Sequence, residues 1–249
     1  MPPGNWNHVR VLLLDIEGTT TPIDFVYKTL FPYAARNVEP FLRAHFSERE
    51  VDALVQDLKA QHGQDHAAGP EPAAWLSGSD DEQLSSCVAY VRWLIARDSK
   101  CTPLKTLQGK IWQQGFARGE LHGEVYPDVP RAFERWRQQQ RRICIYSSGS
   151  LLAQQQLFQS VASGDLTPHI AAYFDTNTGI KTVAASYTKI VAALGLSPGE
   201  FLFVSDAVKE VEAASAAEMH AVLCGRGAPA SAQINLSQTI HTFDEIFPG

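Results

Sequence analysis

VRVLLLDIEGTTTP, residues 9–22, is a nearly continuous apolar run that ends in an acid and leads into a polar, glycine-containing turn. Such a run is typical of a strand buried on both faces, as in a parallel sheet. Similar runs occur later in the chain, at Arg142–Ser147, Phe201–Asp206 and His220–Cys224, with a weaker one at Ile170–Phe174. These runs predict the strands of one parallel sheet.

Helical stretches separate the expected strands. They cover Asp128–Gln140, Leu151–Ser160, Tyr187–Leu194 and Val208–Ala217. Strands that alternate with helices in this way predict an α/β fold with a doubly wound parallel sheet. The region from about Thr21 to Tyr126 differs, because its apolar residues recur at helical spacing and no buried strand is visible. We therefore expect a helical domain, residues 21–125, inserted into an α/β core of residues 1–20 and 126–249.

Acidic residues stand at the ends of two expected strands. Asp15 closes the first, with Glu17 two residues on, and Asp206 closes a later one. Ligands of open parallel sheets bind outside the carboxyl ends of the strands. A carboxylate nucleophile with a nearby acid/base suits phosphoryl transfer, and paired carboxylates suit Mg²⁺. Each residue taken alone could instead be a turn residue or a helix cap.

Hydroxyls and a lysine complete the pattern. Ser147 and Ser148 follow the second long run, where they could hold phosphate oxygens at the start of a helix. Lys181, in NTGIKT, could keep a phosphate and the acids from repelling each other. The alternatives are a cap role for Ser148 and a solvated surface position for Lys181.

The order of these residues along the chain resembles that of the haloacid dehalogenase superfamily. Most members carry Asp where this chain has Glu17. That glutamate, together with DIEGTTTPIDFVYKTLFPYA, LKTLQGKIWQQGF, VYPDVP, YSSGS and FVSD, resembles the enolase-phosphatase family of methionine salvage. The resemblance runs nearly the whole chain. It implies a Rossmann-like sheet with a helical cap inserted after the first strand.

The resemblance also implies a reaction. The substrate would be 2,3-diketo-5-methylthiopentyl-1-phosphate, which is enolised and then dephosphorylated to an acireductone. Mg²⁺ would be bound by Asp15, Glu17 and Asp206. Asp15 would attack phosphorus, with Glu17 as acid and then base.

The same resemblance assigns phosphate binding to Ser147, Ser148 and Lys181. It leaves the base of the enolisation step open between Glu17 and residues of the helical region. Those candidates are Asp98, Lys100 and Lys105, each of which could instead be a surface charge. Trp112 and Phe116 could shelter the methylthio tail or pack between helices.

The same fold also supports other functions. They are a phosphatase for another small phosphate, a catalytically silent sensor and a dehalogenase. Filled catalytic positions argue against a sensor, and the acids that suit a metal argue against a dehalogenase. The cap would set the choice between phosphorylated substrates.

The composition limits which partners the protein can bind. The chain has 249 residues and a formal net charge of −6, which argues against nucleic acid. The sequence shows neither a signal-peptide pattern nor an apolar run long enough to span a bilayer, and its four cysteines lack metal-ligand spacing. We therefore expect a cytoplasmic protein without membrane contact. No heptad seam or long apolar strand edge is visible in the sequence, which favours a monomer, and the resemblance implies a small phosphorylated substrate.

Overall fold

The computed structural model describes residues 6–66, 71–226 and 239–248; residues 1–5, 227–238 and 249 of the expected α/β core lie outside these ranges. The chain forms two compact units. One comprises Met1–Phe25 with His122–Gly249, and the other is Val26–Leu121. Within the described ranges, no helix combines the length and the apolar character that a bilayer crossing requires.

The first unit is built on one parallel sheet with the strand order β3-β2-β1-β4-β5-β6. The strands are β1 (Val11–Leu14), β2 (Arg142–Tyr146), β3 (Ile170–Phe174), β4 (Phe201–Ser205), β5 (His220–Cys224) and β6 (Thr239–Ile240). The predicted parallel sheet is confirmed. The sequence did not predict β6, because a two-residue strand is too short to show a pattern.

The first strand along the chain, β1, lies inside the sheet, between β2 and β4. In β1, Leu14 is paired with Ile145 of β2 on one side and with Val204 of β4 on the other. All four residues of β1 are buried, which explains its unbroken apolar sequence. The residue after β1 therefore emerges at the carboxyl edge, flanked by the ends of β2 and β4.

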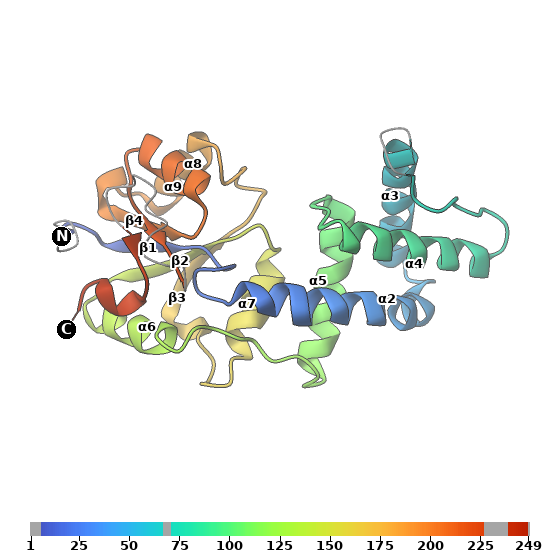
Figure 1. The fold of residues 1–249 in the computed structure, drawn as a ribbon, viewed down its shortest axis with the longest axis horizontal. Helices are drawn as coiled ribbons and strands as arrows, with labels where there is room; N and C mark the ends of the chain where they lie inside the picture. Colours follow the sequence, from blue (N-terminus) through green and yellow to red (C-terminus); the bar gives the residue numbers. More distant parts are fainter. Residues whose placement is uncertain (1–5, 67–70, 227–238, 249) are drawn as a thin grey trace. The chain divides into compact units, whose positions relative to one another are not determined.

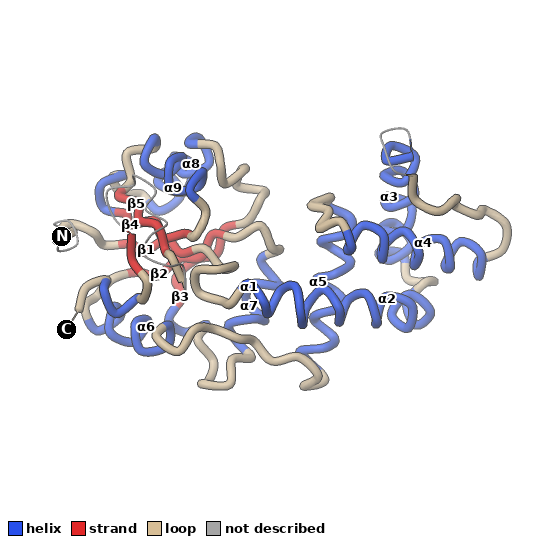
Figure 2. Tube along the Cα trace, viewed as in Figure 1, coloured by secondary structure: helices blue, strands red, loops and turns tan. Residues whose placement is uncertain are grey.

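Helices cover both faces of the sheet, and the strands form the layer between them (Figures 1 and 2). The helices of this unit are α1 (Ile23–Phe25), α6 (Val129–Gln138), α7 (Leu151–Gln159), α8 (Ala184–Leu194) and α9 (Val208–Ala216), with 3₁₀ turns at Thr167–His169, Pro198–Glu200 and Phe243–Glu245. Helices α8 and α9 lie on one face and α6 on the other (Figure 1). The doubly wound α/β arrangement predicted from the sequence is thus present.

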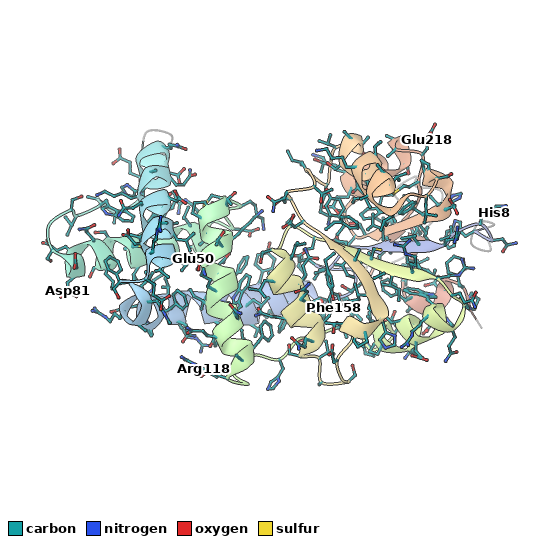
Figure 3. The ribbon with its side chains drawn as sticks, turned by 180° about the vertical axis from the view of Figure 1, so that it is seen from behind. His8, Glu50, Asp81, Arg118, Phe158 and Glu218 are labelled. Carbon is teal, nitrogen blue, oxygen red and sulfur yellow. The ribbon has the colours of Figure 1, made fainter. Side chains whose placement is uncertain are left out.

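Each face has its own apolar core. Val11 and Leu13 of β1 belong to the cluster that includes Tyr187 of α8 and Ala214 of α9, because alternate strand residues point to the same face. Near α6, ring centroids of Phe133 and of Phe158, labelled in Figure 3, are 6.1 Å apart.

The second unit is helical. It contains a π-helical turn at Val26–Leu30 and the helices α2 (Phe31–His45), α3 (Arg49–His66), α4 (Asp80–Ala96) and α5 (Thr102–Ala117). Helix α4 begins with a capping box in which Ser79 and Glu82 satisfy each other's backbone N–H groups. Trp112 is buried and its indole N–H donates to the carbonyl of Leu30 at 2.9 Å, so Trp112 serves the packing of this unit.

An ion pair links two helices of this unit. Glu50 of α3, labelled in Figure 3, pairs with Lys110 of α5 at 2.8 Å. The unit spans Val26–Leu121, where the sequence led us to expect residues 21–125.

Candidate active site

Asp15 lies at the carboxyl end of β1, in the middle of the sheet. Its backbone N–H donates to the carbonyl of Val204 at 3.0 Å, which continues the β1–β4 ladder by one residue. The residue is 3% exposed and is not a helix cap. A carboxylate buried to this degree needs a cation or several hydrogen bonds to stay charged.

Lys181 supplies that cation. Its ammonium lies 2.5 Å from Oδ1 of Asp15 and 2.6 Å from Oε2 of Glu210, and its side chain is 6% exposed. A solvated surface position is therefore wrong for this lysine. Burial opposes its charge, yet the carboxylates of Asp15 and Glu210 raise the pKa of Lys181 above its ordinary value.

The loop that carries Lys181 is held by tyrosine hydroxyls from the core. Tyr187 donates to the carbonyl of Lys181 at 2.7 Å, and Tyr146 donates to the carbonyl of Gly179 at 2.9 Å. Ser186 donates to the carbonyl of Ile180 at 2.8 Å. The ammonium is thereby positioned by the sheet and by α8.

Ser205, the last residue of β4, links the two acids that Lys181 binds. Its hydroxyl lies 2.8 Å from Oε2 of Glu210 and 3.3 Å from Oδ2 of Asp15. A hydroxyl has one proton to donate, so the shorter contact to Glu210 is favoured. Oδ2 of Asp15 is accordingly held less tightly than Oδ1.

A tight turn follows Asp15 and carries Glu17. The hydroxyl of Thr20 donates to the carbonyl of Asp15 at 3.0 Å, and the N–H of Gly18 donates to the carbonyl of Thr21 at 2.8 Å. Gly18 has φ +71°, a conformation that favours glycine. A Cβ on Gly18 would lie only 2.1 Å from Oδ2 of Asp206. The turn therefore needs glycine both for its backbone and for the space that the Asp206 carboxylate occupies.

Asp206 stands one residue beyond β4 and is exposed to solvent. The N-cap of α9 is Ala207, so a capping role for Asp206 is wrong. Desolvation and repulsion from the carboxylates of Asp15 and Glu210 raise the pKa of Asp206 to about 7. Because the residue is accessible to water, repulsion is the cause that the geometry supports better.

The predicted serines lie at the end of β2. Ser147 is buried, donates to Oε2 of Glu17 at 3.4 Å and accepts from the N–H of Gly149 at 3.2 Å. Ser148 is half-buried, and the cap of α7 is Ser150 instead. The structure thus brings Ser147 to Glu17 and excludes Ser148 as the cap.

The donor set suits a hard divalent cation. Asp15, Glu17, Asp206 and Glu210 offer carboxylate oxygens around one buried ammonium, so negative charge is in excess. Across the described residues, no group of three or more His, Cys, Asp or Glu side chains is preassembled to hold a metal ion. Mg²⁺ does not require one, since it usually takes one or two carboxylates together with waters and substrate phosphate. The residues present fit Mg²⁺.

The residues of the helical unit that the sequence offered as bases lie on and before α5. Lys100 donates to Oδ1 of Asp98 at 2.6 Å, and Tyr27 donates to Oδ2 of the same residue at 2.9 Å. Asp98 has φ +50°, an uncommon conformation for a residue with a side chain. Lys105 lies on α5. Asp98 and Lys100 therefore form an ion pair with each other.

Sequence reasoning missed several residues of this edge. In the sequence, Glu210 is only an acid at the start of an expected helix, and nothing local connects it to the Lys181 that it shares with Asp15. Ser205 and Thr19 could not be linked to the acids from the sequence, because Ser205 closes an expected strand and Thr19 lies in a polar turn where hydroxyl residues are common. The Thr19 hydroxyl accepts from the N–H of Asp206 at 3.0 Å, which joins the two acidic loops.

Known proteins resemble this chain over most of its length. The sequence model of a family described as "haloacid dehalogenase-like hydrolase" matches residues 9–218. "Enolase-phosphatase E1" of Synechococcus elongatus is 47% identical over 238 residues, covering 96% of this chain and 98% of the relative. The protein of the same name from Drosophila melanogaster is 46% identical over 218 residues, covering 87% and 83%.

A solved structure is also similar to this chain. The UTR4 protein of Saccharomyces cerevisiae aligns with a TM-score of 0.73 and 31% identity, covering 95% of this chain and 99% of that one.

Proposed function

Because this chain belongs to the haloacid dehalogenase-like hydrolases, and within them to the enolase-phosphatases, we propose that it is an acireductone synthase of methionine salvage. It converts 2,3-diketo-5-methylthiopentyl-1-phosphate into 1,2-dihydroxy-3-keto-5-methylthiopentene and phosphate. The observation that carries the phosphoryl-transfer chemistry is the buried Asp15–Lys181 pair at the carboxyl end of β1. Loss of phosphate from such a substrate requires a nucleophile held in a fixed direction, and this pair provides it.

Asp15 is the nucleophile in this proposal. Lys181 fixes Oδ1, and Oδ2, which is held less tightly, remains available to attack phosphorus. Attack on phosphorus forms an aspartyl-phosphate and releases the enol oxygen. Glu17, two residues beyond, donates a proton to the leaving oxygen and then accepts one from the water that hydrolyses the aspartyl-phosphate.

Phosphate binding falls to Lys181, Ser147 and Ser148. An ammonium has three N–H donors, and Asp15 and Glu210 accept two of them, so the third can bind a phosphate oxygen. The serine hydroxyls at the end of β2 add neutral donors at the edge where Glu17 lies. Together these groups hold the phosphate against an acidic edge.

Asp15, Glu17 and Asp206 would hold Mg²⁺. When bound, Mg²⁺ offsets the negative charge of phosphate and carboxylates during transfer. Glu17 is longer than the usual aspartate by one methylene, and it contacts Ser147, one of the proposed phosphate-binding residues, at 3.4 Å. Its proposed roles at the metal and at the leaving group could therefore compete.

We propose that the helical unit, Val26–Leu121, is the cap that excludes water and selects the substrate. The base that removes the proton beside the ketone is Glu17 in the α/β unit, or Asp98, Lys100 or Lys105 in the helical unit. The protein works as a monomer in the cytoplasm in this proposal.

The nucleophile assignment is tested with Asp15→Asn. We expect phosphate release to fall to background while circular dichroism shows an unchanged fold, because an amide cannot form the aspartyl-phosphate. Ultraviolet absorbance of the enol, measured with the diketone phosphate, separates the first step from the second. Near-normal phosphate release by the variant would refute the role of Asp15.

The metal is tested by chelation. Excess chelator should stop phosphate release, and added Mg²⁺ should restore it, because phosphate would otherwise face an uncompensated acidic edge. Titration of Mg²⁺ into metal-free protein by calorimetry gives a readout without turnover. Full activity in excess chelator would contradict the metal site.

A further inference from the structure

A second buried ion pair lies beside the catalytic turn. Arg226 follows β5 by two residues, and Asp128 is the N-cap residue of α6. Their side chains are 7% and 5% exposed. Nη1 of Arg226 donates to both carboxylate oxygens of Asp128, at 2.8 and 2.7 Å. Neither residue belongs to the groups assigned above to phosphoryl transfer.

The surroundings fix the direction of this guanidinium. It lies 4.3 Å from the ring centroid of Tyr126 and 4.6 Å from that of Phe243. The N–H of Phe243 donates to Oδ2 of Asp128 at 2.6 Å, which also holds the carboxylate. Desolvation offsets much of the attraction in a buried ion pair, so burial alone does not argue for a stabilising role. A planar guanidinium held in this way directs its remaining donors rigidly.

One of those donors reaches the turn that carries Glu17. Nε of Arg226 donates to the carbonyl of Thr19 at 3.1 Å. The Thr19 hydroxyl accepts from the N–H of Asp206 at 3.0 Å. Thr19 is therefore tied to Arg226 through its carbonyl and to the second acidic loop through its hydroxyl.

The backbone N–H of Tyr126 makes a parallel contact, to the carbonyl of Thr20 at 3.0 Å. Tyr126 thus both stacks on Arg226 and binds the next residue of the turn. A displacement of the guanidinium would pass through Thr19 to Glu17, two residues away, and to Asp206.

We propose that Arg226 is a positioning residue for phosphoryl transfer. Its guanidinium, oriented by Asp128, fixes the Thr19 carbonyl and so sets the placement of Glu17 relative to Asp206. This inference rests on the proposed function. Arg226 does not hold the phosphate in this scheme, so its loss affects kcat and leaves KM for the phosphorylated substrate nearly unchanged.

Arg226→Lys is the primary test, with Mg²⁺ and the diketone phosphate as substrate. Lysine keeps a positive charge for Asp128 but cannot reproduce the planar fork that also reaches Thr19. We expect kcat to fall roughly 10- to 100-fold, as for a misplacement of catalytic groups of about 1 Å. Asp128→Asn should lower kcat in the same direction, because it releases the guanidinium.

Two further measurements separate positioning from a merely structural role. Arg226→Ala should recover part of its kcat when methylguanidinium is added, since the space between the rings of Tyr126 and Phe243 accepts that ion. Arg131→Gln is the matched control. It removes an arginine of α6 that pairs with Asp244 at an exposed position, and kcat should not change.

For every variant, kcat is calculated per folded molecule, with the folded fraction measured by circular dichroism. Unchanged kcat in Arg226→Lys and Asp128→Asn would overturn the proposal, and so would lower thermal stability with normal kcat. If Arg226→Lys does not fold, the proposal is tested by the kcat of Asp128→Asn and by the methylguanidinium rescue of Arg226→Ala. Unchanged kcat in the first or no rescue in the second would then overturn it. Absence of phosphate release by the unmodified protein would instead refute the proposed function.

Discussion

Gly18→Ala tests whether the turn after β1 leaves room for the Asp206 carboxylate, a proposed Mg²⁺ ligand. Gly18 has φ +71°, and alanine in this left-handed region costs roughly 1–2 kcal/mol. An added Cβ would lie 2.1 Å from Oδ2 of Asp206, whereas real Cβ atoms stay at least 3.0 Å from such neighbours. The Asp206 carboxylate must therefore move by about 1 Å, which its exposed side chain can do without unfolding the protein.

These two effects predict separate magnitudes. The backbone term lowers the melting temperature by about 2–4 °C per kcal/mol in a chain of this size. The displaced carboxylate lowers kcat/KM on the order of 100-fold, as misplacements of about 1 Å do. Because Asp206 is a proposed Mg²⁺ ligand, the Mg²⁺ concentration for half-maximal activity should also rise.

Gly195→Ala is the matched control. Gly195 ends α8 at φ +66°, and a Cβ there would meet nothing within 4 Å. The two variants should lose similar stability in thermal denaturation, while only Gly18→Ala loses activity in a phosphate-release assay. Equal activity of the two variants would refute the argument that Gly18 is required by the placement of Asp206.

Two other perturbations follow from the ion pairs. Lys181→Met leaves the carboxylates of Asp15 and Glu210 buried without their cation; we expect a loss of roughly 3–5 kcal/mol in denaturant unfolding and loss of phosphate release, and unchanged stability would contradict the ion triad. A hydrogen bond from Arg131 lowers the pKa of Asp244, so its contribution to stability is present above the unfolded pKa and is lost as pH falls through the folded pKa. Asp244→Asn should therefore cost about 0.2–1 kcal/mol of unfolding free energy near pH 6 and progressively less toward pH 3, and a cost independent of pH would count against the pair.

Much of the fold could be predicted because the sheet is parallel and buried on both faces. Burial of every residue of β1 requires an unbroken apolar run, and such runs are visible in the sequence without any tertiary knowledge. The same reasoning could not find β6, whose two residues pair with β5 only because the fold brings them there. Helix boundaries shifted by a few residues, as at α8, which begins at Ala184 and not at Tyr187.

Some residues of the candidate site could also be predicted from the sequence, and others could not. Asp15 and Asp206 could be located because an acid that closes an apolar run stands out against it. Lys181 could not be told from a surface lysine, since burial of an ammonium depends on carboxylates brought from two distant segments. Arg226 gave no signal at all, because its partners Asp128 and Thr19 are remote in the sequence.

The sequence by itself determined the alternation of strands and helices, the inserted helical region and the acids at strand ends, because each is a local pattern set by burial and by turn chemistry. Only the tertiary structure decided which charges share a site. Lys181 is a buried partner of Asp15 and Glu210, and Gly18 makes space for Asp206, through contacts between segments far apart in the chain. Electrostatic energy depends on distances in space, and those distances exist only once the parallel strands have placed their carboxyl ends at one edge.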